Sequence, residues 1–518
     1  LLADSGSVFV QIGDENVHLV RTILDEIFGR SNIITQISYA TTTGRGGKYL
    51  SEATNYIIWY AKDKKSAIAK YHDLFLEKVG ASSAASLFNR SVDQFGRIKH
   101  GVRPDDVAIV EGREHLFRPS DITSARAAGE ADARLFDWHG RDFTPGKRTF
   151  RTDVDGLGRL AQAGRLVATD AGSLRYIEKL EDFTGMPLNN LWADGGTGSF
   201  TDDKLYVVQT GLKVVERCML MTTDPGDLVF DPTCGSGTTA YLAEKWGRRW
   251  ITCDTSRVAI TLAKQRLMTA SFDYFELRYP NEGLKGGFIY KTLPHVTLKS
   301  IANNPEIDSI HARLHPMVTG ALEALNTALR THPPIEPVQI TEGARKGEKV
   351  SFHRRSAELL EWEVPFPRDV PKDEDGRPDL AQLAEMLPIG WPAQLLRAFR
   401  DFHDARQRLQ AAMDASIAAA AESETLYDQP EKARNKLRIT GPFSVEAVPF
   451  PTVLNLDAAD APAAGADFTA DAAIARSGAT NRHAQWRDEL LKTGIRGKAG
   501  QMLKFTALET LAGTTCLH

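Results

Sequence analysis

The stretch GDLVFDPTCGSGTTAYLAEKWGRRWITCDTSRVAITLAKQR, residues 226–266, decides the fold of this chain. Residues 228–230 form a short apolar run that ends at Asp231, residues 235–237 read Gly-Ser-Gly, and Thr238 opens a helical pattern. This order predicts a strand, a tight turn and a helix N-terminus. The unpaired N–H groups and the positive dipole end of such a helix favour the negative part of a ligand.

A second predicted strand ends at Asp254, 23 residues after Asp231. A βαβ nucleotide-binding unit places there the carboxylate that accepts hydrogen bonds from ribose hydroxyls. Gly235, Gly237 and Ala240 also satisfy the dinucleotide fingerprint G-x-G-x-x-G/A, which is a weak signal by itself. Asp231 argues against NAD, because its carboxylate would repel a pyrophosphate. S-adenosylmethionine carries an ammonium, a sulfonium and a ribose, so it fits the two acids better.

Residues 231–239, DPTCGSGTT, resemble the D-P-F-x-G-S-G-T cofactor motif of amino-methyltransferases that modify exocyclic amines in DNA. Residues 207–217, VVQTGLKVVER, resemble the segment P-T-Q-K-P-x-x-L-L-E-R, which precedes that motif in the β-class, permuted DNA methyltransferases such as type III modification subunits. Gln209 is kept, whereas Thr210 and Gly211 stand where the family has Lys and Pro. The resemblance covers roughly residues 1–275.

The resemblance implies an α/β, Rossmann-like methyltransferase fold in permuted order, with an inserted target-recognition region and a mixed α+β C-terminal extension. It implies S-adenosylmethionine as the cofactor. The glycine turn would cradle its methionine end, Asp231 would face its cationic groups and Asp254 would hold its ribose. The cofactor-binding residues are then Asp231, Pro232, Gly235, Ser236, Gly237, Thr238 and Asp254.

Residues 1–62 resemble the strand-helix-strand run that follows the catalytic motif in the same family. The patterns predict a strand at residues 7–12, a helix at residues 15–28 that Gly29 ends, and strands at residues 33–39 and 55–62. We expect these strands to join the sheet whose other half begins at Leu228. Asp14 is the residue of this block that we place near the reaction centre, although an Asp here could equally cap the helix.

Methylation of a base amine is an in-line attack on the sulfonium methyl, and the base must first be flipped out of the duplex. The family holds the flipped base with an acid-Pro-Pro-aromatic motif, which does not occur in residues 1–518. In permuted order that motif precedes the strand at residues 7–12. We therefore expect it upstream of Leu1, in an N-terminally truncated chain that binds cofactor poorly and catalyses little alone.

The insert at residues 63–190 corresponds to the family's target-recognition region. Within it, residues 90–103 and 141–151 interleave Arg and Lys with Phe, which suits phosphate contacts and stacking, although each run alone is more often a solvated face. Residues 41–49 form a glycine-rich loop with two cations, which is read at even odds as a DNA contact or an ordinary solvated loop. The candidate DNA contacts are Arg45, Lys48, Lys147 and Arg148.

The 518-residue chain has a formal net charge of -4 and 42% hydrophobic residues. It is therefore no polycation, and a nucleic acid must meet a local basic surface. Its four cysteines show no metal or disulfide spacing, which predicts thiols buried in a reducing cytoplasm, and no apolar run is long enough to cross a membrane. The cysteines are Cys218, Cys234, Cys253 and Cys516.

We expect six segments along the chain. They are residues 1–62 and 191–275 for the methyltransferase domain, 63–190 for target recognition, 276–456 for an accessory region, 457–480 for a linker, and 481–518 for the start of a further, truncated domain.

The resemblance implies a DNA adenine-N6 methyltransferase of a restriction-modification or phage-defence system, which we expect to be cytoplasmic and free of metal. Its expected partners are double-stranded DNA, a restriction or defence subunit and a second copy of the chain, with no membrane. Three alternatives stay open. They are a cytosine-N4 methyltransferase, a non-catalytic homologue or fragment that binds DNA or a partner, and an NAD-dependent oxidoreductase that rests on the glycine fingerprint alone.

Overall fold

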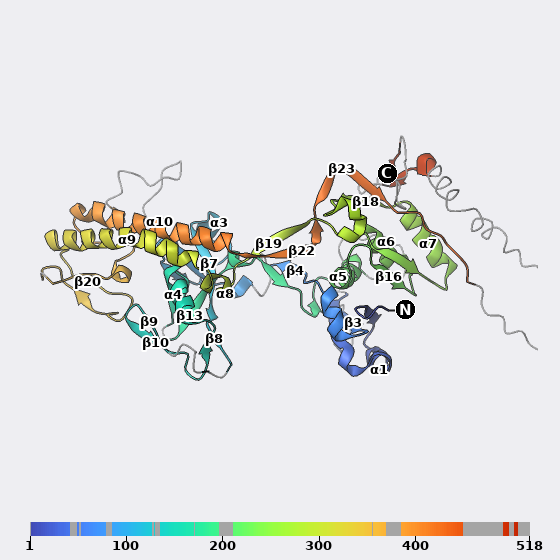
Figure 1. The fold of residues 1–518 in the computed structure, drawn as a ribbon, viewed down its shortest axis with the longest axis horizontal. Helices are drawn as coiled ribbons and strands as arrows, with labels where there is room; N and C mark the ends of the chain where they lie inside the picture. Colours follow the sequence, from blue (N-terminus) through green and yellow to red (C-terminus); the bar gives the residue numbers. More distant parts are fainter. Residues whose placement is uncertain are drawn as a thin grey trace, which may run out of the picture. The chain divides into compact units, whose positions relative to one another are not determined.

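The computed structural model forms two compact units (Figure 1). Unit 1 comprises residues 1–74, 187–291 and 426–518, and unit 2 comprises residues 75–186 and 292–425. The structure describes residues 2–41, 49–50, 53–78, 85–126, 129, 135–169, 171–195, 211–354, 356–368, 385–448, 490–496 and 502–505.

The N-terminal part of unit 1 forms the strands and helix that the sequence predicts. The strand order is β1-β3-β2-β15, antiparallel except for β15, which runs parallel to β2. Helix α1 buries Leu24 against Ile58 and Tyr60 of β3, and it ends at Gly29, whose φ of 82° favours glycine. The elements are β1 (Ser7–Ile12), α1 (Val17–Phe28), β2 (Ile33–Ala40), β3 (Thr54–Ala61) and β15 (Leu191–Trp192).

The stretch at residues 226–266 forms the predicted strand-loop-helix-strand unit, followed by a second helix. Strands β16 and β17 are parallel, with Asp231 opposite Thr252. Helix α6 lies against the two strands, and its Leu242 and Ala243 are fully buried in the core of unit 1. The Rossmann-like α/β fold is therefore confirmed. The elements are α5 (Leu212–Thr222), β16 (Leu228–Asp231), α6 (Thr238–Lys245), β17 (Arg249–Thr252) and α7 (Arg257–Met268).

The two sets of strands in unit 1 do not share a hydrogen-bonded sheet, which differs from the expectation for residues 1–62. In the described residues β16 pairs with β17, β1 pairs with β3, and no ladder joins the two groups. A ladder needs a backbone partner alongside, and none of the described strands lies beside the other edge of β16. Leu228 and Phe230 of β16 and Ile251 of β17 are 51–52% exposed, so the described residues leave one face of this two-stranded ladder uncovered.

The C-terminal extension is shared between the units, because residues 292–425 belong to unit 2 and residues 426–518 return to unit 1. Strand β18 (Ser271–Phe275) pairs antiparallel with β23 (Lys432–Ile439). Ile439 then packs with Leu490 and Ile495 in a small cluster, so the described part of residues 481–518 lies against the end of β23 in unit 1. The expected linker at residues 457–480 lies outside the described residues.

Unit 2 is built on a five-stranded antiparallel sheet of order β12-β13-β7-β5-β6. Two short ladders, β9 with β10 and β8 with β11, and helix α4 complete the N-terminal half of this unit. The elements are β5 (Arg90–Asp93), β6 (Ile98–His100), α3 (Val107–Val110), β7 (Glu114–Asp121), β8 (Thr123–Ser124), β9 (Phe136–Trp138), β10 (Arg141–Phe143), β11 (Thr149–Phe150), α4 (Val154–Gln162), β12 (Leu166–Ala168) and β13 (Leu174–Lys179).

The other half of unit 2 is a helical hairpin of α9 and α10, which lie side by side (Figure 1). The elements are α8 (Leu298–Ala302), α9 (Glu306–Thr331), β20 (Val338–Gln339), β21 (Lys349–Val350) and α10 (Leu396–Ala419). Strands β4 (Phe75–Glu77), β14 (Gly185–Pro187), β19 (Tyr290–His295) and β22 (Glu422–Pro430) lie where the chain passes between the units.

The two halves of unit 2 share one hydrophobic core, so this unit combines most of the insert at residues 63–190 with residues 292–425 of the expected accessory region. Leu157 and Leu160 of α4 are fully buried in the same cluster as Leu325 of α9 and Phe399 of α10. Polar contacts follow the same seam, because Arg159 donates to the Ala302 carbonyl (2.8 Å) and pairs with Asp308 (2.8 Å). Neither half can bury its apolar face alone.

Candidate cofactor site

The loop at residues 232–237, here called the glycine loop, is tied to the strand beside it. The Cys253 N–H donates to the Asp231 carbonyl (2.9 Å), and the Cys234 N–H donates to the Cys253 carbonyl (2.8 Å). The Gly237 N–H then closes the turn on the Cys234 carbonyl (2.8 Å). The loop therefore continues the β16–β17 pairing past the strand ends, which fixes where it delivers the chain to α6.

Two glycines in this loop have backbone conformations that other residues rarely adopt. Gly235 has φ 50° and Gly237 has φ 77°. A Cβ on Gly237 would also lie 2.7 Å from the Ala263 Cβ on α7, which is closer than carbon atoms approach. Gly237 is therefore required both by its backbone and by the close approach of α7.

Both predicted acids bond to the glycine loop itself. The Asp231 carboxylate accepts the Thr233 N–H at Oδ1 (3.0 Å) and the Thr239 hydroxyl at Oδ2 (2.6 Å). The Asp254 carboxylate accepts the Gly235 N–H at Oδ2 (2.8 Å) and the Ser256 N–H at Oδ1 (2.8 Å). A carboxylate can accept about four hydrogen bonds, so each acid can shape the loop and still accept donors from a ligand.

Ser236 and Thr238 are buried residues, 4% and 7% exposed, and their hydroxyls lie 3.5 Å apart. Arg266 of α7 holds this region, because its Nη1 donates to the Thr238 hydroxyl (3.1 Å) and lies 3.4 Å from the Ser236 carbonyl. Its guanidinium also stacks over the Tyr241 ring at 4.5 Å. The Ser236 hydroxyl therefore lies on the inside of the glycine loop.

Sequence reasoning missed Arg266, although one signal could have indicated it. Ala263 touches the glycine loop, and Arg266 follows it by three positions on α7. Residues three apart share a helix face, so a cation at that position faces the same loop.

The end of the segment at residues 207–217 holds helix α5 in place through polar contacts. Arg217 of α5 forms two hydrogen bonds with Asp194, both 2.7 Å, and stacks over the Trp192 ring of β15 at 5.3 Å. Burial alone would raise the pKa of Asp194, but the hydrogen bonds and charges of Arg217 and Lys213 hold it well below its ordinary value. On the same helix, Glu216 accepts the Trp246 indole N–H (2.7 Å). Arg217 thus fixes α5 against β15, and Glu216 fixes it against the end of α6.

The remaining predicted site residues lie elsewhere. Asp14 is exposed in the turn before α1, and the helix cap is Asn16, so Asp14 is not the cap. Among the described residues, no hydrogen bond or ion pair joins Asp14 to the glycine loop. Lys147 and Arg148 are exposed residues of unit 2. Arg45, Lys48, Gln209 and Thr210 lie outside the described residues.

The cysteines only partly match the expectation of buried thiols. Cys218 and Cys234 are buried, whereas Cys253 is exposed, because it follows the exposed Ile251 on the same side of β17. Burial raises the pKa of the Cys218 thiol to about 12. Cys516 lies outside the described residues.

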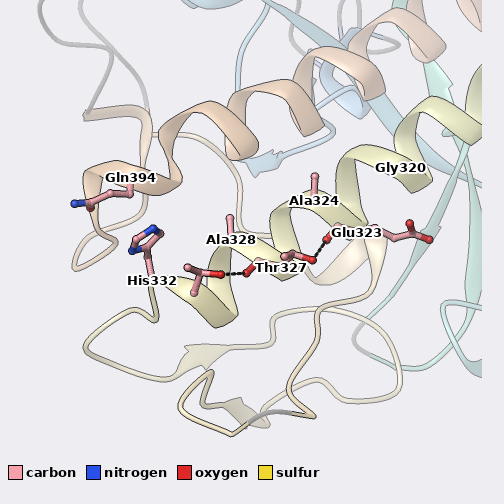
Figure 2. Close-up of a pocket in the computed structure, with 8 residues that line it drawn as sticks. Gly320, Glu323, Ala324, Thr327, Ala328, His332 and Gln394 are labelled. Atoms are coloured by element: carbon pink, nitrogen blue, oxygen red, sulfur yellow. Dashed lines mark hydrogen bonds between the residues drawn. The ribbon is translucent and has the colours of Figure 1, made fainter.

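A shallow hollow on α9 is lined by none of the predicted site residues (Figure 2). Its two lining threonines use their hydroxyls on helix carbonyls, Thr327 on Glu323 (2.8 Å) and Thr331 on Thr327 (2.9 Å). Within the described ranges, no three His, Cys, Asp or Glu side chains cluster as a metal site. The described helices likewise include none long and apolar enough to cross a membrane.

The comparisons with known proteins agree on one family. The sequence model of a family described as DNA methylase matches residues 1–265, just over half of the chain. The type II methyltransferase M.EcaI of Enterobacter cloacae is 24% identical over 281 residues, which cover 51% of this chain and 54% of that protein. The probable type III restriction-modification enzyme HindVI Mod subunit of Haemophilus influenzae is 23% identical over 320 residues, 52% of this chain and 42% of that protein.

Among solved structures, the M1.HpyAVI complex with S-adenosylmethionine aligns with 51% of this chain and 76% of its own, at 12% identity and a TM-score of 0.25. The chain spans about half the length of the curated relatives it matches. On the family match over residues 1–265, the chain belongs to the DNA methylase family. The family predicted from residues 231–239 is confirmed.

Proposed function

We propose that this chain is the cofactor-binding and DNA-reading part of an S-adenosylmethionine-dependent DNA methyltransferase that acts on adenine N6 in a restriction-modification or phage-defence system. The observation that carries the proposal is the glycine loop. It is locked by Asp231 and Asp254, packed on Ala263, and set in a chain of the DNA methylase family.

The residues at the glycine loop fit S-adenosylmethionine in their chemistry. Asp254 keeps acceptor capacity for two ribose hydroxyls, and Asp231 places a negative charge beside the loop, which suits a cationic ligand and disfavours a pyrophosphate. Once bound, the cofactor supplies an electrophilic methyl carbon. The task of these residues is to hold and orient that ligand.

The backbone of residues 235–237 and the first turn of α6 would cradle the methionine carboxylate. Helix α6 begins at Thr238, and Gly237 before it provides no side-chain cap, so the first N–H groups of the helix have no side-chain acceptor from that residue. Ser236 acts through its backbone in this proposal, since its hydroxyl faces Thr238 and Arg266. Pro232 and Thr238 shape the two ends of the loop.

Double-stranded DNA is the proposed substrate, and unit 2 is the proposed reading unit. It contains the insert at the place of the family's target-recognition region, and it exposes Lys147 and Arg148. Residues 292–425 belong to this reading unit, because they complete its core. Arg45 and Lys48 stay proposed phosphate contacts, and Asp14 stays the proposed residue near the reaction centre. A restriction subunit and a second copy of the chain are the proposed partners.

The test is sequencing of modified bases in DNA from cells that express the complete gene. We expect N6-methyladenine at one short recurring sequence, and its loss in the Asp254→Ala variant. N4-methylcytosine at a recurring sequence would move the acceptor to cytosine. DNA without any modified base would contradict the proposal and favour a non-catalytic homologue.

A further inference from the structure

Strand β7 ends at a carboxylate that two arginines share. The Asp121 Oδ2 lies 2.8 Å from Nη1 of Arg148, and its Oδ1 lies 3.5 Å from Nη1 of Arg175, the residue opposite it on β13. The two arginine side chains are 54% and 36% exposed. One negative charge is thus placed between two positive charges that remain open to solvent.

Thr123 also holds the shared carboxylate in place. The Thr123 N–H (2.9 Å) and hydroxyl (2.7 Å) both donate to Asp121 Oδ1. Burial alone would raise the pKa of Asp121, but these bonds and the charges of Arg175 and Arg148 keep it below its ordinary value. Asp121 is therefore ionised at neutral pH and can orient both guanidinium groups.

A third arginine borders the same place. Arg151 is exposed, and its Nε donates to the Thr123 carbonyl (3.2 Å). The β8–β11 ladder brings it there, because Phe150 lies opposite Thr123. The nearby Asp153 uses its carboxylate to cap α4 at the Gly156 N–H (2.8 Å). Arg148 and Arg175 therefore pair with Asp121, and Arg151 contacts Thr123, the residue that holds the Asp121 carboxylate.

The same sheet contains a neutral counterpart. Arg118 of β7 donates to Glu178 of β13 through Nε (2.9 Å) and Nη2 (2.7 Å), so one cation meets one anion in a fork-to-fork pair. The corner at Asp121 has the same cross-strand pairing, but among the described residues three arginines border one shared carboxylate. The excess positive charge is the feature that an anionic ligand would meet.

We propose that Arg148, Arg175 and Arg151, positioned by Asp121, form a clamp for one backbone phosphodiester of duplex DNA. This inference rests on the proposed function and deepens it. Guanidinium groups recognise phosphate oxygens through paired N–H donors, and such contacts set the register of a protein on DNA without reading sequence. Asp121 is a positioning residue, and the three arginines are the contacts.

The test is the salt dependence of duplex binding by the full-length protein, measured by fluorescence anisotropy with a labelled duplex of mixed sequence. Loss of one phosphate contact lowers the slope of log affinity against log salt by about 0.9. We expect that loss in an Arg148→Ala, Arg175→Ala double variant, with binding about tenfold weaker at about 0.1 M salt. Arg118→Ala is the matched control and should keep the wild-type slope.

The Asp121→Asn variant distinguishes arginines positioned by Asp121 from a surface that attracts DNA only through its net positive charge. Removal of a negative charge would strengthen binding if only net charge mattered, whereas loss of the positioning carboxylate should weaken it. The Arg148→Lys, Arg175→Lys double variant keeps both positive charges, so it should keep the slope while lowering affinity, because the fork geometry is lost. Thermal unfolding of each variant shows whether it is folded.

The outcomes distinguish the possible failures. An unchanged slope in the double alanine variant, or tighter binding by Asp121→Asn, would overturn the clamp alone. Inorganic phosphate that displaces the duplex more strongly than sulfate at equal ionic strength would indicate a free-phosphate site and overturn the DNA assignment. A wild-type protein that binds no duplex at all would overturn both the clamp and the proposed function.

Discussion

The cofactor region of unit 1 and the core of unit 2 are assembled in opposite ways. The glycine loop, both acids and Ala263 lie within residues 226–266, so neighbours in sequence are neighbours in space. The core of unit 2 joins residues 122–176 to residues 301–417, and residues 187–291 of unit 1 lie between them along the chain. A single sequence can therefore predict the glycine loop region. It cannot predict the core of unit 2, because no local pattern specifies which distant segments pack together.

The largest expected effect tests the shared core of unit 2. Phe399→Ala removes a fully buried ring of α10 that packs on Trp391 and His403, and it should lower the free energy of unfolding by about 3–5 kcal/mol. Hydrogen exchange of α4 should rise with it, since α4 packs in the same core. The exposed Arg400→Ala on the same helix is the control. Unchanged exchange in α4 would show that the two halves are independent.

The next effect concerns the glycine loop. Gly237→Ala combines a left-handed φ with a 2.7 Å approach to Ala263, so it should cost about 1–3 kcal/mol and weaken cofactor binding at least about tenfold. Gly158→Ala in α4 is the matched control. Its Cβ meets nothing within 4 Å, and it should stabilise by about 0.5–1 kcal/mol. Calorimetric titration with S-adenosylmethionine measures the difference, and equal affinities would contradict the account of the loop.

A smaller effect should appear at the Asp194–Arg217 pair, which holds α5. Asp194→Asn leaves Arg217, whose side chain is 7% exposed, without its counter-charge, and should destabilise by about 1–3 kcal/mol at pH 7. The folded-state pKa of Asp194 lies below its ordinary value, so the carboxylate stabilises fully above about pH 4 and loses this contribution as the pH falls further. Urea unfolding of wild type and variant should therefore converge toward about pH 2. A difference independent of pH would refute the charge pairing.

The smallest effect belongs to the β9–β10 hairpin of unit 2. His139 stacks between Trp138 at 4.0 Å and Trp362 at 4.7 Å, and burial, with the charge of Arg406, lowers its pKa to about 4. The unfolded chain gains a proton near about pH 6.5 and the folded chain does not, so stability should fall between about pH 6.5 and about pH 4.

His139→Gln should remove this component, on the order of 1 kcal/mol after allowance for partial exposure. Denaturant unfolding across that pH range measures it. Parallel pH profiles for wild type and variant would mean that the ring is not held in its neutral form.

Much of unit 1 could be predicted because its signals are local. The strand-helix-strand order of residues 7–61, the glycine loop and the second acid follow from apolar periodicity, small residues and helix stop signals. The sequence predicted less well what each residue does within the glycine loop. Sequence placed Asp231 and Asp254 toward a ligand, and the structure shows that both also hold the loop. Arg266 was missed because no local sequence pattern indicates which residues an arginine side chain on a helix will contact.

The segments expected from the sequence differ from unit 2 for a physical reason. The apolar stripes of α4, α9 and α10 show that each helix needs a partner, but a stripe does not identify the partner. The contact between Leu157 and the helical hairpin joins segments that are far apart along the chain. The arginine excess at Asp121 is also non-local, because Arg148 and Arg175 reach that carboxylate from different strands and loops.

The central claim is that the glycine loop selects a cationic nucleoside ligand. The most direct measurement is titration of the full-length protein with S-adenosylmethionine and, separately, with NADH. We predict that S-adenosylmethionine binds, that Asp254→Ala weakens its binding more than about tenfold, and that NADH does not bind. Binding of NADH, or an Asp254→Ala affinity within about twofold of wild type, would contradict the claim.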